Sequence, residues 1–184
     1  MINPKIDISR TFLETERLML RPFKEEDLQD FFEYASVPDV GEAAGWKHHR
    51  DIAMSGKILD LFIKDKKTFA IVYKQNNKVI GSLGIEKSQF PRTYCPGETA
   101  RDIGYVLSKE YWGHGLMSEA VKRVIEYCFK ELNLDHLTIG HFLDNHRSQR
   151  VIEKMGFTYV YTKPYMTSMG ITLDSREYIL NNPR

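Results

Sequence analysis

Two closely spaced glycines, Gly113 and Gly115, give residues 111–120 the character of an anion-binding loop. Glycine reaches backbone conformations that are closed to other residues, and it lets a ligand approach the chain closely. Apolar residues alternate before this segment, as in a strand, and recur at helical spacing after it. A strand, a turn and a helix therefore meet here, and the first amides of that helix have no partner within it. Together with the helix dipole, those amides favour a phosphate group.

Known nucleotide-binding motifs do not account for this loop. A dinucleotide fingerprint requires a third glycine at Ser118, and a P-loop requires a Gly-Lys-Ser/Thr ending that the chain lacks. A turn without a ligand also explains Gly113 and Gly115, because glycine punctuates turns generally. The loop alone leaves a phosphate site and a plain turn as open interpretations.

A second motif lies further along the chain, in residues 145–157, with the sequence NHRSQRVIEKMGF. Together with the loop, it resembles the GNAT superfamily of acyl-coenzyme A N-acyltransferases, in which a glycine-bearing pyrophosphate loop precedes an N-x-x-S-x-R-V-x-E-K-x-G-F segment. The ETERLMLRP of residues 14–22 and the YWGHG of residues 111–115 are similar to the branch of ribosomal-protein N-terminal alanine and serine acetyltransferases. The matching blocks follow the family's order along nearly the whole chain.

The resemblance implies direct transfer of an acetyl group from acetyl-CoA to a primary amine, with no covalent acyl-enzyme. Two cysteines are the rival nucleophiles. Cys128 lies in the apolar stripe of the helix after the loop, and Cys95 shows no sequence sign of activation. We therefore expect both thiols to be inert, acetyl-CoA to be the co-substrate, and no metal to take part.

The residues that bind acetyl-CoA follow from the family's pattern by position. In this family the strand before the loop splays from its neighbour, so its unpaired amides face the thioester and the pantetheine. The loop amides then bind the pyrophosphate, and the side chain of His114 either contacts a phosphate or is solvated. The acetyl-CoA contacts that the resemblance implies are Tyr105, Val106, Leu107, Trp112, Gly113, His114, Gly115, Leu116, Met117, Ser118, Asn145 and Ser148.

Asn145 and Ser148 each have two compatible interpretations. By resemblance, the asparagine hydrogen-bonds the pantetheine amides, and the serine lies near the sulfur, where its proton could help the thiolate to leave. Asn145 is also a good helix N-cap, with Ser148 in the first turn of that helix. Both interpretations stay open.

Three residues, Asp102, Glu98 and His141, are candidates for the general base. An α-amine has an ordinary pKa of about 7.7–8.0 and needs only a modest base or a water relay, whereas a lysine amine near 10.4 needs more. An α-amine or a weakly basic small amine is therefore the favoured acceptor. Asp102 leads slightly, because it stands where the branch often carries Glu before Ile-Gly-Tyr. A purely structural role is the alternative for all three.

The acceptor side is expected in residues 1–100, mainly in residues 45–49 and the loop 88–97. Trp46 either forms a wall of the acceptor pocket or packs in the interior. The acceptor itself is a protein or peptide amino terminus, or else a small molecule such as an amino acid, a polyamine or an aminoglycoside. A catalytically silent acyl-CoA-binding module and a nucleotide-dependent enzyme are the other classes of function.

These residues require a mixed sheet flanked by helices to position them. We expect a single α+β domain with a mostly antiparallel sheet of about seven strands and about four helices. The resemblance implies that this sheet is splayed between its fourth and fifth strands. Residues 101–160 form its acetyl-CoA-binding core, and the loop 87–98, with Pro91 and Pro96, is the least regular stretch. Periodicity and turn residues predict strands at 17–21, 69–73, 79–85, up to 107, 137–143, 158–162 and 177–180, and helices at 25–34, 52–63, from 116, and 146–155.

Bulk composition agrees with a single domain of this class. The chain has 184 residues, a formal net charge of +1 and two cysteines. Such a charge gives no general attraction to nucleic acid or to membranes, and so few cysteines suit a reducing cytoplasm. No apolar signal core and no apolar run of membrane-spanning length occur in the sequence. We expect a cytoplasmic protein, with a homodimer left open.

Overall fold

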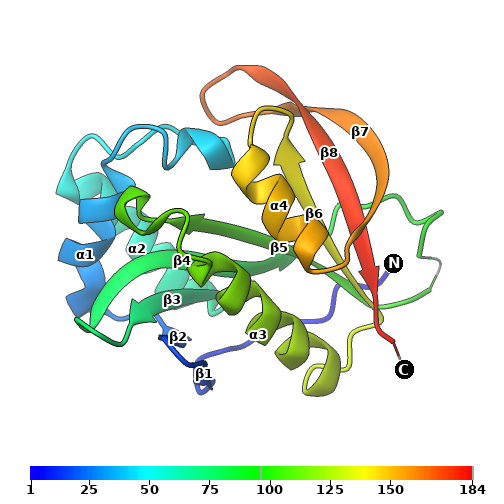
Figure 1. Cartoon of the computed structure of the whole chain (residues 1–184), viewed down its shortest axis with the longest axis horizontal. Helices are drawn as coiled ribbons and strands as arrows, with labels where there is room; N and C mark the ends of the chain where they lie inside the picture. The colour runs from blue at the N-terminus through cyan, green and yellow to red at the C-terminus, as the bar shows by residue number, and fades with distance from the viewer. Residues whose placement is uncertain (96, 184) are drawn as a thin grey trace.

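The computed structural model describes residues 1–95 and 97–183, in which an eight-stranded sheet is flanked by four α-helices (Figure 1). Pro96 of the irregular loop lies outside the described residues. In chain order the elements are β1 (Leu13–Glu14), β2 (Leu18–Pro22), η1 (Glu25–Asp27), α1 (Leu28–Ala35), η2 (Glu42–Ala44), α2 (Ile52–Asp65), β3 (Thr68–Tyr73), β4 (Lys78–Lys87), β5 (Ala100–Leu107), η3 (Lys109–Tyr111), α3 (Leu116–Lys130), β6 (His136–Phe142), α4 (His146–Lys154), β7 (Thr158–Met166) and β8 (Thr172–Asn181).

The sheet has the order β1-β2-β3-β4-β5-β6-β8-β7, and β5 and β6 are its only parallel pair among the described residues. That pair is short, because β5 meets β6 only from Ala100 and His136 to Asp102 and Thr138. Beyond Asp102 the two strands diverge, and we call this divergence the splay. The expected α+β domain, splayed between the strand before the glycine loop and the next strand, is confirmed, with the two-residue β1 as an additional strand.

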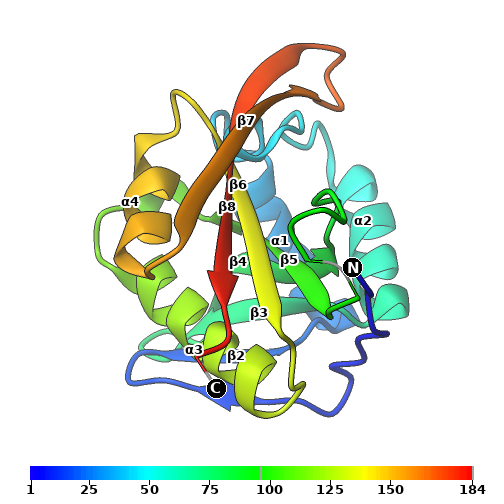
Figure 2. The same ribbon diagram turned by 90° about the vertical axis from the view of Figure 1, so that its right-hand side faces the viewer.

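Helices cover both faces of the sheet. Figure 2 shows α3 and α4 on one face and α1 and α2 on the other. The side chains of β5 alternate accordingly: Ile103 and Leu107 pack in the core that contains α3, whereas Val106 packs against the core built with α1. Residues of even number in β5, including Asp102 and Gly104, therefore belong to the face covered by α1 and α2.

The structure extends the last two strands well beyond their predicted ranges. β7 reaches Met166 and β8 begins at Thr172, so the two form a long hairpin. Most side chains of β7 are exposed. Such a strand lacks the apolar alternation by which strands are recognised in a sequence, which explains the difference.

Two further expectations concern cysteines and membranes. Cys95 and Cys128 are both buried, with free thiols, and burial raises the pKa of the Cys128 thiol to about 12. A thiol with such a pKa stays protonated near neutrality and is a poor nucleophile. In the part of the chain that the structure describes, no helix combines the length and the apolar character needed to cross a membrane.

Candidate active site

The glycine loop has the backbone shape of an anion site. Gly113 and Gly115 have φ angles of 83° and 75°, in the left-handed region that favours glycine, and both are exposed together with His114. Gly115 is the N-cap of α3 and offers no side chain to the first amides of the helix. Leu116 and Met117, by contrast, are buried in the core, so they contribute to the loop through their backbone. The first turn of α3 is therefore open to an external acceptor such as a phosphate oxygen.

The beginning of β2 holds this loop in place. Arg17 Nε donates to Glu119 Oε2 over 2.7 Å, and Arg17 Nη1 donates to the carbonyl of His114 over 3.0 Å. Thr15 Oγ1 donates to Glu119 Oε1 over 2.6 Å. These hydrogen bonds outweigh the effect of burial and lower the pKa of Glu119, so this carboxylate is ionised at neutral pH. The conformation of the loop thus depends on residues that lie about a hundred positions earlier in the chain.

Trp112 closes the connection between β5 and the loop. Its Nε1 donates to the carbonyl of Leu107 over 2.8 Å, and the guanidinium of Arg147 lies 3.8 Å from the centre of its ring. Arg147 belongs to the first turn of α4, so this cation–π contact joins α4 to the loop. The sequence motifs indicated Trp112 but gave no sign of its contact with Arg147.

Two of the three backbone amides expected to face the thioester do point into the splay. The amide of Ser108 donates to the carbonyl of Ile80 on β4 over 2.7 Å. Because successive strand residues direct their amides to opposite edges, the amides of Tyr105 and Leu107 point toward β6. The amide of Val106 points toward β4. β6 does not pair with this part of β5, so the amides of Tyr105 and Leu107 face the splay.

A hydroxyl pair spans the splay on the face covered by α3 and α4. The phenol of Tyr105 on β5 lies 2.9 Å from Ser148 Oγ on α4. Burial raises the pKa of Tyr105 to about 12, so its phenol keeps its proton at neutral pH. The structure thus joins two sequence-predicted residues through a contact between side chains, whereas the sequence had indicated only the backbone of Tyr105.

Asn145 caps α4 and also reaches across to η2. Its Oδ1 accepts from the amide of Ser148 over 3.1 Å, as an N-cap does, and its Nδ2 donates to the carbonyl of Ala43 over 3.1 Å. Both polar atoms of its amide therefore have partners within the protein. A contact with pantetheine would have to share one of these atoms.

Asp102 lies at the last paired position before the splay. Thr138 Oγ1 donates to Asp102 Oδ1 over 2.6 Å, and Thr138 is also 2.9 Å from the hydroxyl of Ser88. Burial outweighs this hydrogen bond, and the nearby charge of Glu177 adds to its effect, so the pKa of Asp102 is raised to about 7. A carboxyl with this pKa exchanges its proton near neutrality, as a general base requires.

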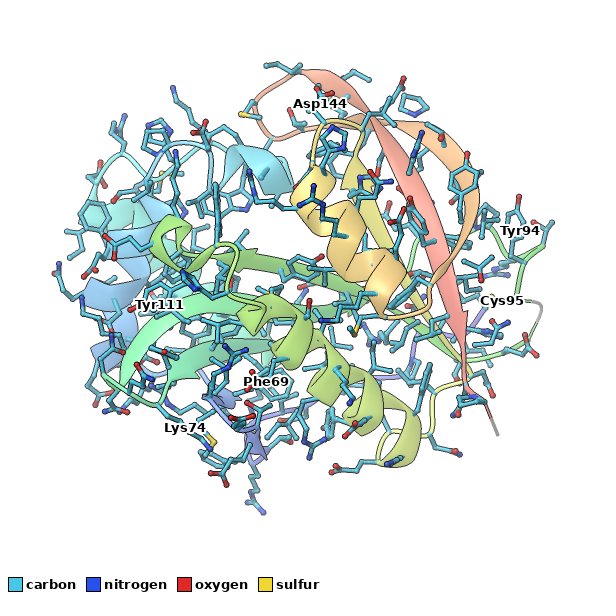
Figure 3. The ribbon with its side chains drawn as sticks, viewed as in Figure 1. Phe69, Lys74, Tyr94, Cys95, Tyr111 and Asp144 are labelled. Carbon is cyan, nitrogen blue, oxygen red and sulfur yellow. The ribbon has the colours of Figure 1, made fainter. Side chains whose placement is uncertain are left out.

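The other two candidates for the base lie in different surroundings. Glu98 precedes β5 at its far end from the glycine loop, where its carboxylate is 2.7 Å from His136 Nε2. Figure 3 shows the neighbouring Cys95 at the opposite side of the molecule from Tyr111. Ligand atoms of Cys95, Glu98 and His136 lie within 4.8 Å of one another, and this group could hold a metal ion away from the loop. The structure therefore places the Glu98 carboxylate against His136, at the end of β5 away from the glycine loop.

His141 is buried on the face covered by α3 and α4. Its Nδ1 donates to the carbonyl of Phe142 over 2.8 Å, and its Nε2 lies 3.0 Å from the hydroxyl of Tyr178. Burial lowers the pKa of His141 below its ordinary value. Both ring nitrogens have partners, as in a histidine that is part of a core.

Trp46 packs inward rather than into the large cavity of the site. Its ring centre is 5.1 Å from that of His49, and it fills the space that a side chain at Gly41 would need. A cavity of about 680 Å³ lies instead where η2 approaches the end of β6, near Asp144 (Figure 3). Its charged lining residues are four acids and two bases, namely Asp39, Glu42, Asp144, Asp174, Lys109 and Arg147.

A splayed sheet with an open helix N-terminus beside the splay is the arrangement of an N-acetyltransferase domain, and comparison with known families agrees. Residues 17–158 match the family model described as the acetyltransferase (GNAT) domain. The chain therefore belongs to the GNAT acetyltransferase family.

Similar proteins cover nearly the full length of the chain. YoaA of Bacillus subtilis, named as an uncharacterized N-acetyltransferase, is 27% identical over 178 residues, which cover 94% of this chain and 97% of YoaA. The crystal structure of a GNAT-family acetyltransferase from Bacillus anthracis has a TM-score of 0.83 at 24% identity, covering 95% of this chain and 100% of that one. The ribosomal-protein-S5-alanine acetyltransferase of Vibrio fischeri has a TM-score of 0.70 at 22% identity, with 94% and 97% covered. These two structures share the fold.

Proposed function

We propose that the protein transfers the acetyl group of acetyl-CoA directly to a primary amine. The observation that carries this proposal is the position of the splay. The part of β5 that does not pair with β6 is followed by the short η3 and then by the loop of Gly113 and Gly115, and that loop ends at the N-terminus of α3, which has no side-chain cap. Thioester and pyrophosphate are the two parts of one ligand that such adjoining sites suit.

The residues present fit acetyl-CoA, which supplies the activated acetyl group when it is bound. The exposed loop from Gly113 to Gly115 leaves the first amides of α3 available for the pyrophosphate. The amides of Tyr105 and Leu107 donate into the splay, where negative charge develops on the thioester carbonyl oxygen. Residues 101–160 thereby form the part of the domain that binds acetyl-CoA.

Asp102 is the residue that we propose as the general base, acting directly or through water. In its ionised form it takes one proton from the acceptor's ammonium group, which frees the nitrogen lone pair to form the new C–N bond. The C–S bond then breaks, and sulfur leaves with its electron pair. Ser148 donates its hydroxyl proton to this sulfur, and the phenol of Tyr105 donates a proton to Ser148 in its place. Tyr105 in turn takes up the proton that the new amide nitrogen loses. The products are the N-acetylated amine, coenzyme A as its free thiol, and one proton.

The acceptor is a protein or peptide amino terminus in the reading we favour, and a small-molecule amine is the alternative. An α-amine is deprotonated readily by a carboxylate with a pKa of about 7. The shared fold with the Vibrio fischeri enzyme that acts on a ribosomal protein supports the same choice. In this proposal residues 1–100 supply the acceptor side of the site, and the acceptor enters through the cavity beside Asp144. The protein acts in the cytoplasm.

Release of the free thiol from acetyl-CoA tests the proposed function. The purified protein is incubated with acetyl-CoA and with peptides that begin with Ala, Ser or Thr, with polyamines, with amino acids and with aminoglycosides. We expect acceptor-dependent thiol release with at least one class of primary amine, and mass spectrometry should find the acetylated product. Binding of acetyl-CoA without thiol release for any amine would contradict the transferase and favour a silent acyl-CoA-binding module.

A further inference from the structure

Three glycines on neighbouring strands lie side by side on the face of the sheet covered by α1 and α2. Gly84 of β4 pairs directly with Gly104 of β5, and Gly140 of β6 pairs with Glu177 of β8. Gly104 and Gly140 each lie two residues beyond the last pair of β5 and β6, so they face each other where the splay begins. Paired residues direct their side chains to the same face. We call Gly84, Gly104 and Gly140 the glycine floor.

Open space lies over the middle of this floor. A methyl group added at Gly84 would lie 2.8 Å from Glu86 Oε1, and one added at Gly140 would lie 2.9 Å from Glu177 Oε1. A methyl group added at Gly104 would meet no atom of residues 1–95 and 97–183 within 4 Å, and Gly104 is exposed although β5 is central in the sheet. Carboxylates therefore lean over both ends of the floor, and its centre is accessible.

The groups around the floor carry an excess of negative charge. Glu86 is paired with Lys67 over 2.5 Å, and Glu177, which is only 6% exposed, is paired with Lys163 over 3.4 Å. Asp102 belongs to the same face, next to Glu86 across the strand pair, and is held by the hydroxyl of Thr138. Once Asp102 is ionised, three carboxylates face two lysines, so these groups carry a net charge of −1 that one further cation would balance.

A buried hydroxyl without a partner points to the same place. Thr68 of β3 pairs with Gly84, and its Oγ1 lies 3.4 Å from the position of a methyl group at Gly84. Thr68 is 4% exposed, and its hydroxyl has no hydrogen-bond partner among the residues that the structure describes. A buried polar group of this kind is uncommon in native proteins, because it pays the cost of desolvation without a compensating bond. A ligand on the glycine floor would supply that bond.

We propose that the glycine floor is the binding site for the acceptor as an ammonium ion, and that it selects primary amines with no carboxylate close to the amine. Glu177 and Asp102 balance the ammonium charge, and the Thr68 hydroxyl bonds to a polar atom further along the acceptor. Peptide amino termini and aliphatic diamines share this chemistry, whereas free amino acids bring a negative charge that the surrounding carboxylates repel. This inference rests on the proposed function and adds its acceptor class.

Matched pairs of acceptors test the selectivity by thiol release with acetyl-CoA. The dipeptide Ala-Ala is compared as its amide and as its free acid, and 1,5-diaminopentane is compared with 6-aminohexanoate. We expect kcat/KM to be at least about tenfold higher for the member without the carboxylate, which is the effect of one like charge roughly 10 Å away. Whether the peptide pair or the diamine pair gives the larger kcat/KM then shows which of the two classes of amine is the acceptor. Equal use of both members of each pair would overturn the inference while leaving the acetyltransferase intact.

Two substitutions locate the selectivity on the floor. Glu177→Gln should reduce the preference within each pair by several fold, and Gly104→Ala should raise KM for the amine without changing the affinity for acetyl-CoA. The matched control is Gly56→Ala in α2, where the added methyl group makes only an ordinary contact with Leu28. Unchanged amine kinetics in Gly104→Ala would contradict the site. If no amine is turned over, calorimetry measures the binding of 1,5-diaminopentane and of 6-aminohexanoate to the native protein and to Glu177→Gln. Equal affinities of the two amines would refute the site.

Discussion

Arg17 and Glu119 form an ion pair with a closest distance of 2.7 Å, which ties the beginning of β2 to the first turn of α3. The same arginine bonds to the carbonyl of His114, inside the exposed glycine loop. The two residues belong to sequence blocks that resemble the family separately, and the structure shows that the first block supports the second. Through Arg17, the exposed glycine loop and the first turn of α3 are connected to the same point of β2.

Removal of the Glu119 carboxylate should weaken the binding of acetyl-CoA. In Glu119→Ala the guanidinium of Arg17 loses the carboxylate that orients it beneath the loop, so we expect the dissociation constant to rise about tenfold, the effect of one hydrogen bond to a charged group. Isothermal titration calorimetry measures this constant. Glu131→Ala at the end of the same helix, where the carboxylate is half exposed and 3.7 Å from Arg123, is the control. The same affinity in both variants would show that the pair does not shape the loop.

Gly115 and Gly170 allow backbone strain to be separated from ligand binding. Both have a φ of 75°, and both would receive a methyl group without a close contact. Each change to alanine should destabilise the protein by about 1–2 kcal/mol through the left-handed conformation. Only Gly115→Ala should also weaken the binding of acetyl-CoA, by about tenfold or more, because the altered backbone turns the first amides of α3 away. Calorimetry and thermal unfolding of both variants check this, and equal affinities would remove the loop from the proposed site.

The loop, the splay and the order of elements were predictable because they depend on local patterns and on matching blocks. Apolar residues alternate before Gly113 and recur about every 3.6 residues after Gly115, and such a change of spacing can be seen in a sequence. The surroundings of Asp102 could not be predicted in the same way. Thr138, Glu177 and the floor glycines come from strands far apart in the chain, and no local pattern specifies the register that brings them together.

Side-chain partners were the other feature that the sequence could not show. Tyr105 was expected to act through its amide, but the alternation of β5 also places its phenol against Ser148. The sequence allows Trp46 to be a wall of the pocket or a packing residue. Its contact with His49 depends on the conformation of a loop, which no periodic pattern in the sequence describes. Contacts of this kind require the tertiary structure.

The hydroxyl pair of Tyr105 and Ser148 should act as one unit. Ser148→Ala removes the group proposed to protonate the sulfur, and we expect kcat to fall about tenfold or more. Tyr105→Phe should have a smaller effect, and the double variant should be no slower than Ser148→Ala, because Tyr105 acts through Ser148. Steady-state kinetics measure all three, with the exposed Tyr94→Phe as the control. Fully additive losses would mean that the two hydroxyls act independently.

Asp102 should make the stability of the protein depend on pH. Its pKa in the folded state, about 7, is higher than the ordinary value of 3.8, so the folded state binds this proton more tightly than the unfolded state. The contribution of Asp102 to stability is therefore complete below about pH 4 and is lost as the pH rises to 7. The side chain in Asp102→Asn does not ionise. The Tm of this variant relative to that of the native protein should therefore increase over that window, and the variant should exceed the native protein by at least about 4 °C at pH 8. Thermal unfolding from pH 4 to 8 measures it, and a constant difference would contradict the raised pKa.

The same carboxyl should control the rate near neutrality. If Asp102 is the base, only its ionised form works, so kcat should rise with pH through an inflection near 7 and then level off. Asp102→Asn should lose this inflection together with about a hundredfold of kcat. Thr138→Val separates Asp102 from other groups, because the Thr138 hydroxyl lowers the pKa of Asp102 and its loss must move the inflection to higher pH. An inflection that stays in place in Thr138→Val would assign it to another residue, whereas a shift with nearly full activity at high pH identifies Asp102 as the titrating group.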